Sequence, residues 1–229
     1  IPYLYTPLYP GVVATAGAVV GISYQLGRAI SILSLLGVFA VGAASLVGDG
    51  DRSARASSWS GMALATGLIA AAYPFVDGWY DLVRADTLFL FLVISGLVAA
   101  YRFSASGGGF AAHLKVALAG AILALAFFCK QTGILYVAAG GAVVLVRDWR
   151  RVPAFVAAAG ALGLGGAAIL QRASGGWFWT YAFEVHQAHD FNMDRFWGSF
   201  GTILLHFPAM TLVIGVGLLL VAATAVARG

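Results

Sequence analysis

Four ionisable residues stand beside long apolar runs of the sequence, where charge is costly and therefore informative. Arg28 lies in QLGRAISIL, Arg84 and Asp86 lie in VRADTLFLF, and Lys130 lies in AFFCKQTGILY. A charged group near a membrane core costs on the order of 2.5–3.5 kcal/mol on insertion scales, so such residues reach the interface or face a polar site. A guanidinium and an ammonium both suit phosphate. The pattern predicts a lipid-phosphate site formed by Arg28, Arg84 and Lys130, with Asp86 and Gln131 supporting it.

Each of these residues also has an ordinary interpretation. Arg84 and Asp86 could form a local ion pair, and a carboxylate in the first turn of a helix is favoured by the helix dipole. Arg28 and Lys130 could extend along their aliphatic stems to the interface. No acidic residue neighbours Lys130 in AFFCKQTGILY, which makes its ammonium the stronger candidate for a ligand. The sequence leaves both interpretations open.

The composition defines the setting of these residues. Hydrophobic residues make up 61% of the 229 residues and charged residues only 10%, well outside the range of a soluble domain. The apolar runs approach the roughly 20 residues that cross a bilayer, and they lack the alternation of a β-barrel. We therefore predict an all-α, polytopic transmembrane bundle of about seven spans, near 24–47, 58–76, 86–102, 113–129, 131–146, 153–171 and 200–227.

The remaining segments predict how the bundle is arranged. Residues 1–22 form an extracytoplasmic, juxtamembrane segment, in which 11–20 is an interfacial helix closed by Gly21, with Ser23 capping the first span. Residues 23–229 form the bundle and include an outer loop, 172–199. Lys and Arg are concentrated at one set of helix ends, which predicts that this side faces the cytoplasm. The net charge of +4 follows from this bias, so we expect the lipid bilayer and no nucleic acid as a partner.

The loop 172–199 contains a polar cluster in EVHQAHDFNMDRFW. Its residues are Glu184, His186, His189 and Asp190. All four are metal-ligand types, and the two histidines would share a face if the segment were helical. A divalent metal, a sugar or acceptor contact and an ordinary solvated loop are all compatible with this pattern; we predict no metal and no other cofactor. Further on, His206 precedes a proline and is expected to pack at a helix kink.

Three stretches, taken in order, carry a resemblance over roughly residues 1–150. They are YTPLYPGVVA with GISYQLGRAISILSLLGVFAV, then LVRADTLFLFLVISGLVAAYR, then ALAFFCKQTGILYVAAGGAVVLVRDWRR. Their order and spacing resemble the polytopic glycosyltransferases of the GT-C superfold, in the branch containing the protein mannosyltransferase and aminoarabinose transferase families. The resemblance implies a transferase of the bacterial inner (plasma) membrane that uses a polyprenyl-phosphate-linked sugar at the extracytoplasmic face.

The resemblance also implies what precedes the chain. In those families a first helix and a large outer loop with the catalytic Asp come before the stretch that YLYTPLYPGVVATAGAVV resembles. The catalytic Asp would then lie upstream of Ile1, and the sequence would be an N-terminally incomplete fragment. No residue of the present sequence can be assigned as the general base.

Two other classes of membrane protein are compatible with the composition. A non-catalytic subunit of a larger membrane complex would have the same spans, with a degraded outer site. A transporter would place polar residues near mid-membrane and would show broken helices or repeats. The predicted spans carry almost no interior charge and no internal repeat, which makes the transporter the less favoured of the two.

Overall fold

The computed structural model of the chain describes residues 6–46, 52–73, 82–105, 107–187 and 192–228. Their long helices are α1 (Leu8–Val20), α2 (Tyr24–Leu46), α3 (Arg52–Ala72), α4 (Asp86–Ser104), α5 (Phe110–Cys129), α6 (Gly133–Asp148), α7 (Val152–Ala173), α10 (Met193–His206) and α11 (Pro208–Arg228). A 3₁₀ turn (Trp149–Arg151) joins α6 to α7, and α8 (Trp177–Trp179), a π-helical turn (Thr180–Glu184) and α9 (Val185–Gln187) follow α7. These ranges contain no strand, which confirms the predicted all-α class.

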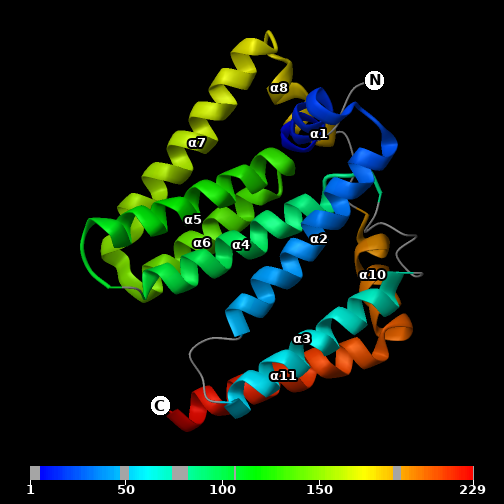
Figure 1. Cartoon of the computed structure of the whole chain (residues 1–229), viewed down its shortest axis with the longest axis vertical. Helices are drawn as coiled ribbons and strands as arrows, with labels where there is room; N and C mark the ends of the chain where they lie inside the picture. The colour runs from blue at the N-terminus through cyan, green and yellow to red at the C-terminus, as the bar shows by residue number, and fades with distance from the viewer. Residues whose placement is uncertain (1–5, 47–51, 74–81, 106, 188–191, 229) are drawn as a thin grey trace.

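Four stretches within the described ranges are long and apolar enough to cross a membrane: Tyr24–Ser45, Asp86–Ser104, Phe110–Cys129 and Gly133–Ala173. They are what an integral membrane protein requires. The last stretch folds back on itself, because a methyl group placed on Gly140 of α6 would lie 3.1 Å from the ring of Phe155 in α7. A continuous helix would separate positions 140 and 155 by about 22 Å. The chain therefore turns at Trp149–Arg151 and returns as α7 (Figure 1).

The predicted count of seven spans is not confirmed. The predicted span 58–76 corresponds to α3, whose apolar part, Trp59–Ala72, is shorter than the four stretches above. The predicted span 200–227 is not one helix, because α10 and α11 meet at Phe207 with a bend of 96°. Pro208 accounts for the break, since proline lacks a backbone donor and its ring clashes with the preceding turn. The kink predicted there is observed, and His206 lies at it with an exposed side chain whose Nδ1 is 3.0 Å from the Thr202 carbonyl.

Small residues allow the helices of the core to approach closely. A methyl group on Gly120 of α5 would lie 2.5 Å from the carbonyl oxygen of Phe155, and one on Gly96 of α4 would lie 2.5 Å from Leu123. Such close backbone approach is typical of helices packed in membranes. The buried core between α4, α5, α6 and α7 consists of Ala99, Ala100, Val116, Ala119, Leu123, Val144, Phe155 and Ala159.

Contacts between helix termini divide the bundle into two ends. At one, Val83, just before α4, packs against Gly27 of α2, where an added methyl group would lie 2.5 Å from it. We call this the site end; it includes Lys130, which follows α5. At the other, Arg102 Nη2 of α4 donates to the Ser45 carbonyl of α2 at 2.8 Å. We call this the basic end; it also contains the turn between α6 and α7.

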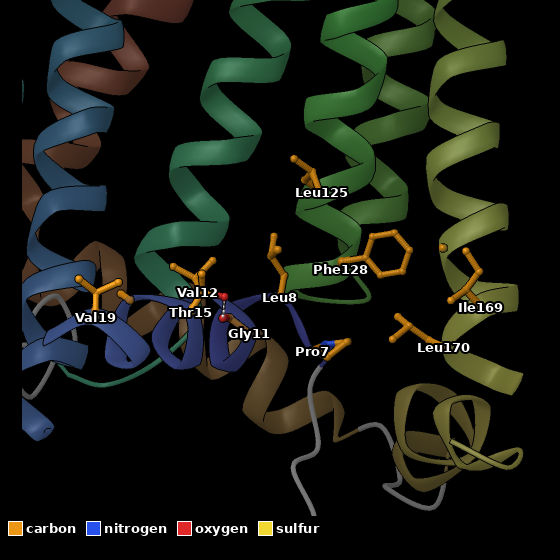
Figure 2. A pocket seen from close by; sticks show the side chains of 12 residues that line it. Pro7, Leu8, Gly11, Val12, Thr15, Val19, Leu125, Phe128, Ile169 and Leu170 are labelled. Carbon is orange, nitrogen blue, oxygen red and sulfur yellow. Dashed lines mark hydrogen bonds between the residues drawn. The ribbon is translucent and has the colours of Figure 1, made fainter. Parts of the chain in front are cut away.

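The first helix ends as the sequence predicts. Gly21 has φ 86°, a left-handed conformation that glycine adopts readily, and its N–H donates to the Gly17 carbonyl at 2.8 Å. Ser23 Oγ accepts from the Leu26 N–H at 3.1 Å, which confirms Ser23 as the residue that caps α2. Figure 2 shows α1 running across the site end, transverse to α5 and α7.

Candidate functional site

Three of the charged residues singled out in the sequence meet at the start of α4. Lys130 Nζ donates to Asp86 Oδ1 at 2.6 Å, and Arg84 Nε donates to Asp86 Oδ2 at 3.1 Å. The Asp86 and Lys130 side chains are 25% and 23% exposed, and Arg84 is 34% exposed. Two cations therefore share one carboxylate in a partly buried cluster. The local ion pair and the acid in the first helical turn, both anticipated for Arg84 and Asp86, are present.

A tight turn aims Lys130 at this carboxylate. Lys130 leaves α5 in an extended conformation, and its carbonyl accepts from the Gly133 N–H at 2.8 Å. Gly133 is required for this turn, because a methyl group there would lie 2.6 Å from the Ala126 carbonyl carbon. The Lys130 ammonium also lies 5.9 Å from the centre of the Phe89 ring in α4, a cation–π contact. Sequence-distant elements thus fix the position of the ammonium.

Buried hydroxyl groups hold the segment that carries Arg84. Ser31 of α2 is fully buried, and its Oγ donates to the Leu82 carbonyl at 2.6 Å. The Tyr9 hydroxyl of α1 lies 3.2 Å from Ser31 Oγ and 3.0 Å from the Gly27 carbonyl. Burial raises the pKa of Tyr9 above its usual value, although its hydrogen bond with Ser31 opposes this, so the hydroxyl keeps its proton at neutral pH. The entry to α4 is therefore fastened to both α1 and α2.

Two further bonds fasten the end of α5. Thr6, which is 1% exposed, donates from Oγ1 to the Phe127 carbonyl at 2.8 Å. Cys129 is fully buried and donates from Sγ to the Ala85 carbonyl at 3.3 Å. Together with Tyr9, Ala85 and Cys129 form a small buried cluster at the site end. The Ala85 carbonyl, next to Asp86, and the Phe127 carbonyl, three residues before Lys130, thus each accept from a side chain of another segment.

The other predicted phosphate ligands lie at the same end. Arg28 is exposed in the first part of α2, one residue after Gly27, which packs against the segment before α4. Gln131 lies in the turn after α5, where its carbonyl accepts from the Ile134 N–H at 3.2 Å. Within the described chain, Asp86 is bonded by Arg84 and Lys130, and Arg28 does not join that cluster.

An apolar groove of about 850 Å³ opens between α1, α5 and α7 (Figure 2). Its walls include Leu8 and Val12 of α1, Phe128 of α5, and Ile169 and Leu170 of α7. Leu8 also packs against the buried cluster at the site end, so the groove begins beside the segment that positions Lys130. The lining is almost entirely hydrocarbon. One polar side chain, Thr15, donates to the Gly11 carbonyl of its own helix at 2.8 Å.

Aromatic rings pack the first part of the predicted outer loop against α5. Phe178 lies 6.5 Å from Phe128 and Phe183 lies 6.3 Å from Phe127, measured between ring centres. Trp179 lies 4.5 Å from Phe183. The backbone of this segment is helical, with α8, the π-helical turn and α9.

The predicted acceptor or sugar contacts are only partly described. Glu184 is exposed and accepts from Thr180 Oγ1 at 2.8 Å. The His186 side chain, His189 and Asp190 lie outside the described residues. Among the residues that the structure describes, no group of three or more His, Cys, Asp or Glu side chains is arranged to hold a metal ion.

Sequence reasoning missed the partner of Lys130 and the hydroxyls around it. Asp86 is 44 positions away in the chain, so no local pattern pairs the two. Ser31 and Thr6 carried a weak signal, as hydroxyl residues beside or within apolar segments. The chain matches no protein-family model, and no curated protein or solved structure is significantly similar to it.

Proposed function

We propose that this chain is the membrane portion of a glycosyltransferase that moves a sugar from a polyprenyl-phosphate-linked donor to an extracytoplasmic acceptor. The observation that carries the proposal is the convergence of Arg84 and Lys130 on one point at the start of α4. Breaking the bond between a sugar and a lipid phosphate leaves charge on the phosphate, and preorganised cations stabilise that charge. Within the described residues, both cations donate to the same carboxylate, that of Asp86.

The groove between α1, α5 and α7 supports a donor with a long hydrocarbon chain. Its volume of about 850 Å³ lies within the range of ligand pockets, and its lining offers an isoprenoid chain a hydrocarbon surface. The groove begins near Leu8, which packs beside Ala85 and Cys129. A lipid phosphate at the cation cluster could therefore lay its chain along α1. Arg28 and Gln131 would complete the phosphate site from α2 and from the turn after α5.

The proposal includes a topology. The site end faces the extracytoplasmic side, and α1 is the outer juxtamembrane segment. About seven spans, comprising α2 to α7 and α11, cross a bacterial plasma membrane. The support is the excess of exposed cations at the basic end, where Arg102, Lys115, Arg147 and Arg150 accompany a single described carboxylate, Asp148. Asp148 is itself paired with the neighbouring Arg151 at 2.8 Å.

A carboxylate must also accept the proton of the acceptor hydroxyl. The resemblance to GT-C enzymes assigns that role to an Asp upstream of Ile1. Within this chain, the segment 177–187 packs against the end of α5 through Phe183 and Phe127. We propose that this segment and Glu184 contact the sugar or the acceptor. No metal is required in this scheme, because the fixed cations supply the charge stabilisation.

One observation favours a second candidate, a non-catalytic subunit of a larger membrane complex. The 2.6 Å bond between Lys130 and Asp86 is a sufficient structural role for both side chains, since it ties α4 to the turn after α5. In that case the cluster would hold the bundle together without binding a phosphate.

Donor-dependent thermal stabilisation separates the two candidates. We expect the full-length wild-type protein to gain about 2.7 kcal/mol at a polyprenyl-phosphate sugar concentration of about 100 times Kd. Lys130→Gln should lose most of this gain, whereas Lys130→Arg should retain part of it because the charge survives. Arg172→Gln is the matched control, since Arg172 is an exposed cation in the last turn of α7. A wild-type protein without any donor-dependent gain would support the structural subunit instead.

A further inference from the structure

The helix α10 separates its polar and apolar side chains onto opposite faces. At 100° per residue its apolar side chains, apart from Leu205, fall within one arc and its polar side chains fall within the opposite arc. The apolar set is Met193, Phe196, Trp197, Phe200, Ile203 and Leu204. The polar set is Asp194, Arg195, Ser199, Thr202 and His206. A helix with this pattern suits the boundary between an apolar medium and water.

The apolar side chains of α10 are exposed in the structure. Trp197 is 63% exposed and Phe200 is 49% exposed, and no α10 side chain is buried. The aromatic rings on this face contact one another, with the Trp197 and Phe200 centres 5.7 Å apart and those of Phe196 and Phe200 5.3 Å apart. They form a continuous aromatic ridge. Such a ridge needs an apolar or amphipathic environment.

The following helix constrains the orientation of α10. The 21 residues of α11, most of them apolar, span about 31 Å, which matches the thickness of the hydrocarbon core of a bilayer. The 96° bend at Phe207 then places α10 close to the plane of the membrane surface. The other terminus of α10 is also defined, because Asn192 Oδ1 accepts from the Arg195 N–H at 2.7 Å and caps the helix.

We propose that α10 lies in the membrane–water interface, with Phe196, Trp197 and Phe200 among the upper acyl chains and its polar face toward water. Tryptophan and other aromatic rings are favoured at this depth. Asp194 and Arg195 cancel in charge, so neutral phospholipid suffices as the partner of this face. Of the two helices α10 and α11, only α11 crosses the bilayer in this arrangement. The proposal is independent of any catalytic role.

Spin labels on single cysteines in the full-length protein test this arrangement. A Cys129→Ser background keeps a hydrogen-bond donor at the buried position, and the protein is placed in phosphatidylcholine vesicles. Labels at Trp197, Phe200 and Leu204 should be more accessible to oxygen than to a water-soluble nickel chelate. They should share one depth of about 5–10 Å below the headgroups. Labels at the matched polar-face positions 195, 199 and 202 should show the reverse preference.

Labels in α11 provide the internal ruler. Depth should change by about 1.5 Å per residue, or about 10 Å between Leu212 and Leu219. An equally steep change from Trp197 to Leu204 would mean that α10 crosses the bilayer, and would overturn the proposal. Labels on the apolar face that are shielded from both reagents would identify a protein partner or second copy as its cover. Access to the nickel chelate on both faces would equally refute a lipid-bound helix.

Discussion

The bond between Lys130 and Asp86 makes the most direct prediction about the site end. Lys130→Gln removes the ammonium but keeps a side chain of similar reach, and Asp86→Asn removes the carboxylate charge with almost no change in shape. The bond joins the first residue of α4 to the residue after α5 at 2.6 Å, and both side chains are about three-quarters buried. We expect either change to lower the free energy of unfolding.

The magnitude follows from the burial of the pair. Opposite unit charges 4 Å apart attract by about 4 kcal/mol at an effective dielectric constant near 20. Removal of both groups from solvent offsets much of this, and hydrogen bonds to charged groups contribute about 1.5–3 kcal/mol net. We therefore expect about 1.5–3 kcal/mol for Lys130→Gln. Arg84→Gln should cost less, because its bond to Asp86 is 3.1 Å long and its side chain is more exposed.

A double-mutant cycle isolates the interaction from the other effects of each substitution. Apparent unfolding midpoints of wild type, Lys130→Gln, Asp86→Asn and the double variant are measured in the same detergent. At about 2–4 °C per kcal/mol for a chain of this size, each single change should lower the midpoint measurably. The double variant should be more stable than the sum of the single losses predicts, with a coupling energy of about 1–3 kcal/mol. Additive losses would refute a direct bond between the two side chains.

Two further predictions concern the packing of the bundle and its basic end. Gly120→Ala should destabilise the protein by about 1–3 kcal/mol, because the added methyl group meets the Phe155 carbonyl, whereas Gly160→Ala, with open space around it, should be neutral or stabilising in the same thermal assay. Arg151→Met should cost about 1.5–3 kcal/mol and increase proteolysis after α4, because the buried guanidinium donates to the Phe103 carbonyl at 2.5 Å and to the Gly107 carbonyl. Equal stability of the two glycine variants, or unchanged proteolysis, would contradict these expectations.

The sequence predicted those features that depend only on residues close together in the chain, such as helices and their ends. The apolar runs identified a helical membrane protein, because each run is long enough to satisfy its own backbone hydrogen bonds. Gly21 and Ser23 marked the end of α1 and the start of α2, since a left-handed backbone and a side-chain cap are properties of single residues. Asp86 marked the first turn of α4 for the same reason. The prediction that Arg28, Arg84 and Lys130 lie close together also rested on helix boundaries; Arg84 and Lys130 meet at Asp86, and Arg28 lies at the same end of the bundle.

Features set by packing between distant segments could not be predicted in this way. The pairing of Lys130 with Asp86 depends on how α4 meets the turn after α5, and the sequence around Lys130 suggested an ammonium without an acidic neighbour. The break at Phe207 did have a signal, because Pro208 lies inside an apolar run. Length and hydropathy outweighed that proline in the prediction of one span over 200–227.

Hydrogen bonds around α1 connect the two segments that carry Arg84 and Lys130, in addition to the ion pairs between their side chains. Thr6 bonds the Phe127 carbonyl near the end of α5, and Tyr9 packs with Ser31, which holds the Leu82 carbonyl before α4. Thr6, two residues before α1, and Tyr9 within α1 thus contact both segments whose separation sets the distance from Lys130 to Asp86. The same helix forms a wall of the apolar groove through Leu8. We therefore infer that a ligand in the groove would contact α1, the helix that also contacts the segments carrying Arg84 and Lys130.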